Sequence, residues 1–179
     1  GVSCIQYFQS DMNHLPVGRP PFTPGSFDAV LGVASVHHCA NLEQIYHHIG
    51  TLLSPGGWLF LDEYVGPDQF QWSDSQIRHL NRIAGLLPDR LMTTLDGACK
   101  RNFRRPSVAE VVAVDPSEAI CSSLLLPLLP KYFSSVLIRP YGGAILHMLL
   151  AGVAQNFIGT QVEPYLRSVM AAEDELYRA

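Results

Sequence analysis

Side chains that can move protons stand just after two apolar runs of the sequence. His37 and His38 follow the run at 27–36, and Glu63 and Tyr64 follow "WLFLD" at 58–62. A histidine or a carboxylate in this position can act as a general base toward a bound acceptor. Ligands of open α/β sheets bind outside the carboxyl ends of the strands. His37, His38 and Glu63 are therefore candidate catalytic residues, with structural hydrogen bonding as the alternative for each.

Five side chains that can bind metal lie close together in this part of the sequence: His37, His38, Cys39, His47 and His48. Adjacent histidines are expected to point apart, and His47 and His48 are not an i, i+4 pair on a helix. Neither H-E-x-x-H nor C-x-x-C accompanies them. The spacing therefore predicts solvent-facing histidines and no metal site.

The elements that would position these residues form one repeating pattern. The run at 27–36 is almost continuously apolar, as in a buried parallel strand. Asn41 and Gln44 have the spacing of a helix N-cap, and the segment after them has one apolar face: Leu42, Ile45, Tyr46, Ile49, Leu52 and Leu53. Pro55-Gly56-Gly57 ends that helix before a second strand at 58–64. Strand, helix and strand predict a right-handed crossover in a parallel sheet.

The rest of the chain predicts a single domain over residues 1–179. Further helices are expected after Ser73 and Ser107, at 145–157 and at 162–177, with strands at 5–9 and 134–141. The segments 66–130 and 142–160 exceed what a minimal sheet needs.

Composition narrows the class of protein. Hydrophobic residues make up 47% and charged residues 16% of the chain, and the net charge is −4 without a basic run, so a nucleic-acid partner is not expected. No apolar segment reaches the length of about 20 residues that a membrane span needs. The four cysteines show no disulfide framework, which favours a cytoplasmic protein. The oligomeric state stays open.

An ordered set of motifs resembles class I S-adenosylmethionine-dependent methyltransferases. The set comprises Asp11, Leu15-Pro16, Phe27-Asp28, His37-His38 and the helix end "LSPGG" at 53–57. The resemblance implies a partial Rossmann-like, doubly wound α/β fold with a mainly parallel sheet and helices on both faces. It also implies that the family's first two strands and its last strand are absent from this chain. The segment 5–9 would then either pair directly with the strand at 28–36 or leave a chain that folds poorly alone.

The resemblance also assigns roles to residues. Asp11 would accept a hydrogen bond from the adenine amino group of the cofactor S-adenosylmethionine, and Met12 would pack on the adenine face. Val36, His37 and His38 would border the cofactor and the methyl-transfer site. The segments 66–130 and 142–160 would be acceptor-pocket or lid insertions. The implied activity is methyl transfer to an oxygen or nitrogen of a small-molecule acceptor.

The family's glycine-rich loop has no counterpart among the fourteen glycines of this chain. We therefore expect a C-terminal portion of a methyltransferase domain that is inactive by itself. The alternative is a non-catalytic remnant or interaction module that binds no cofactor.

Overall fold

The computed structural model describes residues 4–178, which form two compact units. Within the described residues, unit 1 consists of 4–71 and 106–137, and unit 2 of 72–105 and 138–178. The single-domain organisation with insertions at 66–130 and 142–160 stays a prediction, and the two units are described separately.

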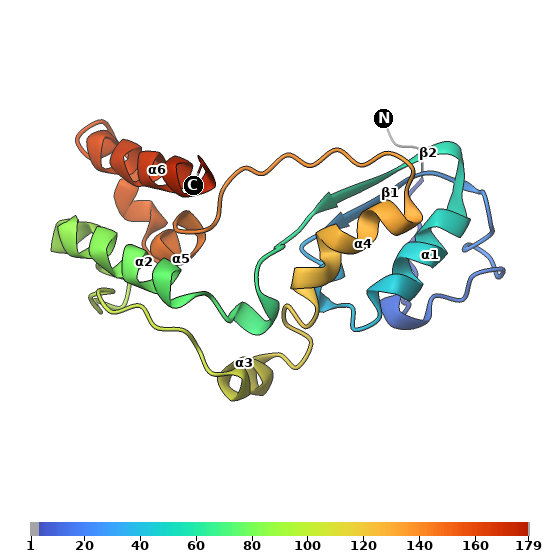
Figure 1. Ribbon diagram of the computed structural model, residues 1–179, viewed down its shortest axis with the longest axis horizontal. Coiled ribbons are helices and arrows are strands. Elements are labelled where there is room, and N and C mark those ends of the chain that lie inside the picture. Colours follow the sequence, from blue (N-terminus) through green and yellow to red (C-terminus); the bar gives the residue numbers. More distant parts are fainter. Residues whose placement is uncertain (1–3, 179) are drawn as a thin grey trace. The chain divides into compact units, whose positions relative to one another are not determined.

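Unit 1 is built on one strand–helix–strand crossover. Strand β1 (Phe27–Val33) pairs in parallel with β2 (Leu53–Asp62), and helix α1 (Leu42–Leu52) connects them (Figure 1). The register runs from Ala29 opposite Trp58 to Val33 opposite Asp62. The predicted α/β class and parallel pairing are confirmed. β2 begins at Leu53, five residues before the predicted start at 58, because the Pro-Gly-Gly segment is itself part of the strand.

Helix α1 forms where the sequence pattern predicts it. The Asn41 side chain accepts a hydrogen bond from the Gln44 backbone N–H at 3.1 Å, which caps the helix, and the predicted apolar face is buried. Gly56 in β2 has φ +80°, as predicted for this turn. Gly57 serves a different purpose, since a Cβ there would lie only 3.0 to 3.2 Å from three backbone carbonyl oxygens, those of Ser54, Phe27 and Asp28.

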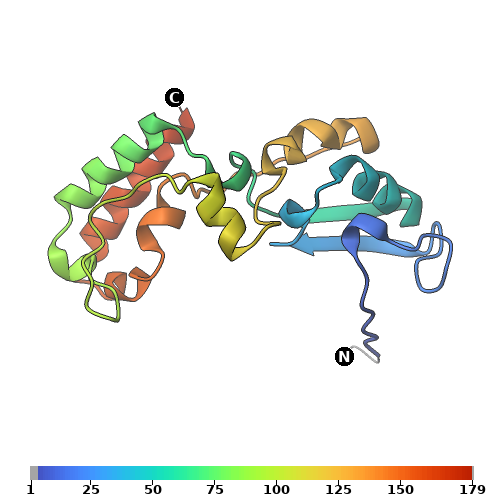
Figure 2. The same ribbon diagram turned by 90° about the horizontal axis from the view of Figure 1, so that it is seen from below.

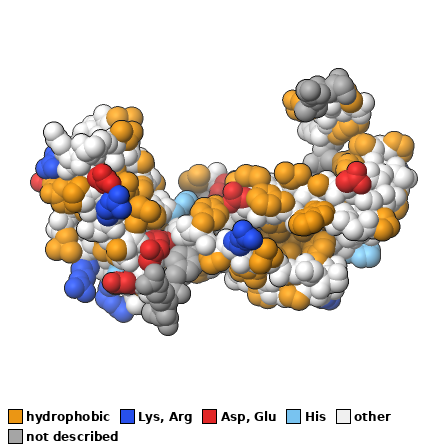
Figure 3. Space-filling view, turned by 90° about the horizontal axis from the view of Figure 1, so that it is seen from above, with side chains coloured by type: hydrophobic (Ala, Val, Ile, Leu, Met, Phe, Trp, Pro, Cys, Tyr) orange, Lys and Arg blue, Asp and Glu red, His pale blue; other side chains and the backbone are white. Residues whose placement is uncertain are grey.

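Only one face of the two-stranded sheet is covered within the described residues. Val30, Leu59 and Leu61 pack toward a core shared with α1 and α4 (Leu125–Tyr132), and Figure 2 shows both helices on that side of the strands. The residues of the other face are exposed, at 69% for Leu31, 58% for Val33, 76% for Trp58 and 56% for Phe60. The helices expected on the second face are not found in the described part of the chain. Hydrophobic side chains are visible at the surface of both units in Figure 3.

The two outer strands predicted from the sequence do not form. Residues 5–9 are unpaired, with Tyr7 89% exposed, so direct pairing of this segment with β1 is wrong. The segment 134–141 contains no strand either. An extended segment without a neighbouring strand gains neither ladder hydrogen bonds nor buried area to offset its conformational entropy.

Short helices complete unit 1. The helix predicted after Ser107 is confirmed as α3 (Val108–Val114), with a complete capping box between Ser107 and Glu110. The remaining turns are short 3-10 helices: η1 (Met12–His14), η2 (Val36–His38), η3 (Asp68–Phe70) and η5 (Ser122–Leu124).

Unit 2 is helical and has its own core. It contains α2 (Asp74–Leu86), η4 (Asp89–Leu91), α5 (Leu146–Leu150), η6 (Ala154–Phe157) and α6 (Glu163–Arg178). The helices predicted after Ser73 and in the C-terminal segment are confirmed. The helix predicted at 145–157 is wrong as one element, because Gly152 at φ +74° separates α5 from η6. Within the residues described, no helix has the combination of length and hydropathy that a membrane span requires.

Candidate functional site

A buried carboxylate organises the turn that follows β1. Glu63, immediately after β2, accepts hydrogen bonds from the backbone N–H groups of Ser35 at 3.0 Å and Val36 at 2.8 Å. Its side chain is only 2% exposed. Ala34, at the start of this turn, has φ +46°, a conformation that costs a non-glycine residue free energy and is found preferentially at functional sites. Glu63 therefore fixes the backbone that presents η2.

The same carboxylate holds the first histidine of the site. His37 Nδ1 lies 2.7 Å from Glu63 Oε2, and the His37 side chain is 9% exposed. Burial alone would raise the pKa of Glu63, but the hydrogen bonds from Val36, Ser35 and His37 outweigh it and lower that pKa below its usual value. The ionised carboxylate accepts a hydrogen bond from the Nδ1–H of His37, so the lone pair of the imidazole ring lies on Nε2.

The second histidine is fixed by a hydrogen-bonded chain from a distant loop. His38 Nδ1 lies 3.0 Å from Ser117 Oγ, and the Ser117 hydroxyl donates to Asp115 Oδ1 at 2.7 Å. The hydrogen bonds from the Ser117 side chain and backbone, together with the neighbouring histidines, lower the pKa of Asp115. The Ser117 hydroxyl oxygen therefore accepts a hydrogen bond from the Nδ1–H of His38, which leaves His38 Nε2 as an acceptor.

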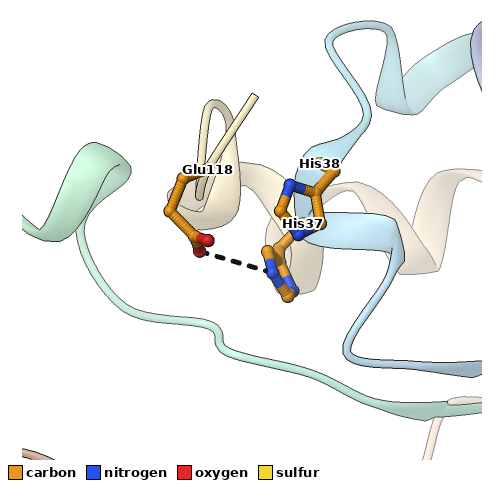
Figure 4. A group of neighbouring side chains, drawn as sticks. All are labelled: His37, His38 and Glu118. Atoms are coloured by element: carbon orange, nitrogen blue, oxygen red, sulfur yellow. Dashed lines mark ion pairs between the residues drawn. The ribbon is translucent and has the colours of Figure 1, made fainter. Parts of the chain in front are cut away.

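The expectation that His37 and His38 point apart into solvent is wrong. Their ring centroids are 4.2 Å apart, and His37 is buried. Glu118 Oε1 lies 3.5 Å from His37 Nε2, and Figure 4 shows the Glu118 carboxylate directed at the His37 ring. The rings are close because η2 turns tightly and its two side chains are held by separate partners, Glu63 and Ser117.

The carboxylate of Asp11 makes hydrogen bonds to nearby residues at the N-terminal side of unit 1. Its carboxylate accepts from the Asn13 N–H at 2.8 Å and lies 2.9 Å from His14 Nδ1. The hydrogen bonds from His14 and Asn13 lower the pKa of Asp11, whose side chain stays 59% exposed. Asp11 is thus an accessible anion, and its role toward adenine stays a prediction.

The predicted cofactor-packing residues lie against the core of unit 1. Val36 is buried in the cluster around α1, and Met12 is partly buried against the same cluster. Asn13, which the sequence reading missed, accepts from the Ala40 N–H at 2.9 Å and so ties η1 to the start of α1. The roles of Met12 and Val36 toward a cofactor stay predictions.

The cysteine beside the histidines is not a nucleophile. Burial, and then the negative charges of Glu63 and Asp11, raise the pKa of Cys39 to about 11. A thiol with that pKa remains protonated at neutral pH. The site therefore offers acid–base chemistry at His37 and His38 rather than thiolate chemistry at Cys39.

Asp115, Ser117 and Glu118 are the site residues that sequence reasoning missed. They lie almost 80 residues beyond the histidines, in a turn where the sequence indicates only the stop of a helix at Asp115-Pro116. Three hydroxyl and carboxylate side chains next to a proline were the available signal, but nothing in their spacing predicts the histidines as partners.

Acidification should weaken the turn that Glu63 holds. The folded-state pKa of Glu63 lies below its usual value near 4.5, so its contribution to stability is present above pH 4.5 and is lost as pH falls through the lowered pKa. We expect the difference in unfolding free energy between the wild type and Glu63→Gln to shrink on acidification, measured by denaturant unfolding at a series of pH values. Glu175→Gln, at an exposed position, is the control. A difference independent of pH would contradict this account.

The fold and the site together define an α/β unit with a hydrogen-bonded histidine–glutamate pair at the carboxyl ends of adjacent parallel strands. Residues 1–61 match the family described as a methyltransferase domain. A stretch of 87 residues is 33% identical to the highly reducing polyketide synthase lcsB of Purpureocillium lilacinum. That stretch is 49% of this chain and 3% of the relative, so the chain spans a small part of that protein. No solved structure matches the chain. The predicted resemblance to class I methyltransferases is therefore confirmed by a family match that spans residues 1–61.

Proposed function

We propose that this chain is part of an S-adenosylmethionine-dependent methyltransferase, with a small molecule as methyl acceptor and His37 as the base. One observation supports the proposal above all others: the 2.7 Å contact between His37 Nδ1 and Glu63 at the carboxyl ends of β1 and β2. It leaves His37 Nε2 able to take a proton. A base near neutral pKa typically contributes a factor of about 100 to 10,000 to a rate.

Each residue of the pair has its own task. His37 Nε2 removes the acceptor proton as the acceptor lone pair forms its bond to the methyl carbon. Glu63 does not take the proton itself, because its buried oxygens are occupied by the backbone of the turn. It holds the His37 ring and stabilises the imidazolium that forms, which makes Glu63 a positioning residue. When bound, the cofactor would supply a methyl group on a positively charged sulfur.

The residues present fit one end of such a cofactor. The Asp11 carboxylate is exposed and ionised, so an oxygen lone pair can accept a hydrogen bond from an adenine amino group. Both oxygens also have local partners, which hold the carboxylate in one orientation. A glycine-rich loop for the methionyl end does not occur in this sequence.

Two kinds of acceptor atom need the base. An oxygen or nitrogen acceptor loses its proton as it becomes methylated. The similarity to a protein named as a polyketide synthase favours a further acceptor, a polyketide-type chain, in which a carbon between two carbonyl groups has an acidic hydrogen. Nuclear magnetic resonance of the product made with ¹³C-methyl cofactor distinguishes a methyl on oxygen or nitrogen from one on carbon.

Asp11→Asn should weaken the binding of S-adenosylmethionine by about tenfold, the equivalent of one hydrogen bond to a charged group. Asparagine is also a good N-cap, so the η1 turn should persist. Isothermal titration with the protein as its gene encodes it provides the measurement. The matched control is Asp96→Asn, an exposed aspartate that likewise holds a local turn through Thr94 and Ala98.

The two outcomes separate the proposal from its alternative. Equal affinity in wild type and Asp11→Asn removes Asp11 from the site. No binding by the wild-type protein supports the non-catalytic remnant or interaction module instead.

A further inference from the structure

Three potential metal ligands converge at the turn after β1. One ligand atom each from His37, His38 and Glu118 lies within 4.8 Å of the other two. Figure 4 shows Glu118 directed at His37 with His38 beside it, although Glu118 comes from a loop about 80 residues further along the chain. Two imidazoles and one carboxylate form a donor set typical of zinc and similar divalent transition metals, with one position left open.

The hydrogen bonds around this cluster prepare both rings for metal binding. Metal-ligating histidines usually donate their other ring N–H to a carboxylate or another acceptor, which fixes the tautomer. Glu63 accepts from His37 Nδ1, and the Ser117 hydroxyl, itself bonded to Asp115, accepts from His38 Nδ1. Glu63 and Ser117 therefore do not engage the Nε2 lone pairs of His37 and His38.

The spacing of two ligands already suits a small cation. In a tetrahedral site with bonds of about 2.0 to 2.1 Å, neighbouring ligand atoms lie about 3.4 Å apart. The separation between His37 Nε2 and Glu118 Oε1 is 3.5 Å. The Glu118 side chain is 27% exposed, so its rotation can adjust the third distance without unpacking the core.

From these observations we infer that His37, His38 and Glu118 form a site for a divalent transition metal of the zinc class, and that the bound metal inhibits the enzyme. The inhibition rests on the proposed function, because the metal takes the same His37 Nε2 lone pair that removes the acceptor proton. The binding of the metal does not rest on the proposed function. The competing arrangement is a protonated His37 between Glu63 and Glu118, which needs no metal.

Cobalt titration of the full-length protein tests the site without relying on activity. The d–d absorption of Co²⁺ should appear with saturation at one ion per chain, and Zn²⁺ should displace it. Glu118→Gln should weaken Co²⁺ binding by at least about tenfold, because even the loss of a residue that only supports a ligand costs about 10- to 100-fold. His47→Gln, at an exposed histidine on α1, is the matched control and should bind Co²⁺ as the wild type does.

A second variant protects the test against misfolding. Ser117→Ala keeps all three ligands but removes the acceptor for His38 Nδ1, and should weaken Co²⁺ binding by a smaller factor than Glu118→Gln. Circular dichroism checks the fold of each variant. The absence of saturable binding, or equal affinity in wild type and Glu118→Gln, overturns the site and favours the protonated His37.

Inhibition is measured separately. Zn²⁺ should slow methyl transfer by the wild type at concentrations that leave Glu118→Gln active. Metal binding in a protein without methyl-transfer activity would refute the proposed function and keep the site. Activity insensitive to bound Zn²⁺ would refute the inhibition.

Discussion

Replacing His37 with glutamine should slow methyl transfer by about 100- to 10,000-fold, the range that a general base contributes. Glutamine can donate its amide N–H to Glu63, as His37 Nδ1 does at 2.7 Å, so the turn after β1 keeps its hydrogen bonds. What the variant lacks is a side chain that can accept a proton near neutral pH. The expected loss is therefore in the chemical step, with the affinity for S-adenosylmethionine nearly unchanged.

Single-turnover transfer of a labelled methyl group, with the full-length protein and saturating cofactor, gives the rate. The exposed His47→Gln substitution is the control for a histidine outside the site. His38→Gln is the informative comparison, because His38 is held by Ser117 rather than by a carboxylate. A larger loss in His38→Gln than in His37→Gln would transfer the role of base to His38, and losses below about tenfold in both would refute base catalysis here.

The proximity of His37 and Glu63 could be predicted from the sequence. Both residues follow apolar runs on either side of a capped helix, and the carboxyl ends of paired parallel strands share an edge. Sequence alone did not reveal that Glu63 faces inward and binds the backbone of the turn. That arrangement depends on Ala34 adopting φ +46°. An alanine in an apolar run does not predict such a conformation.

The partners of the histidines in the loop at 115–118 could not be predicted from the sequence. Ser117 and Glu118 carry no periodic pattern, and their turn reaches the histidines because α4 packs against α1. Long-range packing of this kind follows from the whole core rather than from any local motif. The same limit explains residues 5–9, whose β propensity counts for little without a neighbouring strand.

The apolar runs of β1 and β2 predicted coverage on both faces. The structure covers one face and leaves Leu31, Trp58 and Phe60 exposed on the other. A continuous apolar strand indicates that both of its faces favour burial. It does not indicate which segment of the chain covers each face. The prediction of the sheet was correct, and the prediction of its second layer is not met by the described residues.

Glu173→Ala should lower the unfolding free energy of unit 2 by about 3 kcal/mol or more, because it removes a buried carboxylate that accepts hydrogen bonds from the backbone. Glu173, on α6, is 2% exposed. Its two oxygens accept hydrogen bonds from four consecutive backbone N–H groups at the start of α5, those of Gly143, Ala144, Ile145 and Leu146. A buried donor that loses its acceptor costs about 1 to 3 kcal/mol, and the alanine variant leaves several such donors without one.

This role could not be predicted from the sequence, because Glu173 is one of several acidic residues in an amphipathic helix. Glu175→Ala, two residues further along α6 at an exposed position, is the matched control and should change stability by less than about 0.5 kcal/mol. Denaturant unfolding gives the free energies, and hydrogen exchange at Ile145 and Leu146 localises the loss. Equal stability of the two variants would contradict the assignment. Glu173→Gln should fall between them, since its amide keeps one acceptor oxygen but turns an N–H₂ group toward backbone donors. That ordering follows only if the carboxylate acts as an acceptor for backbone N–H groups, and not merely as a side chain that fills space.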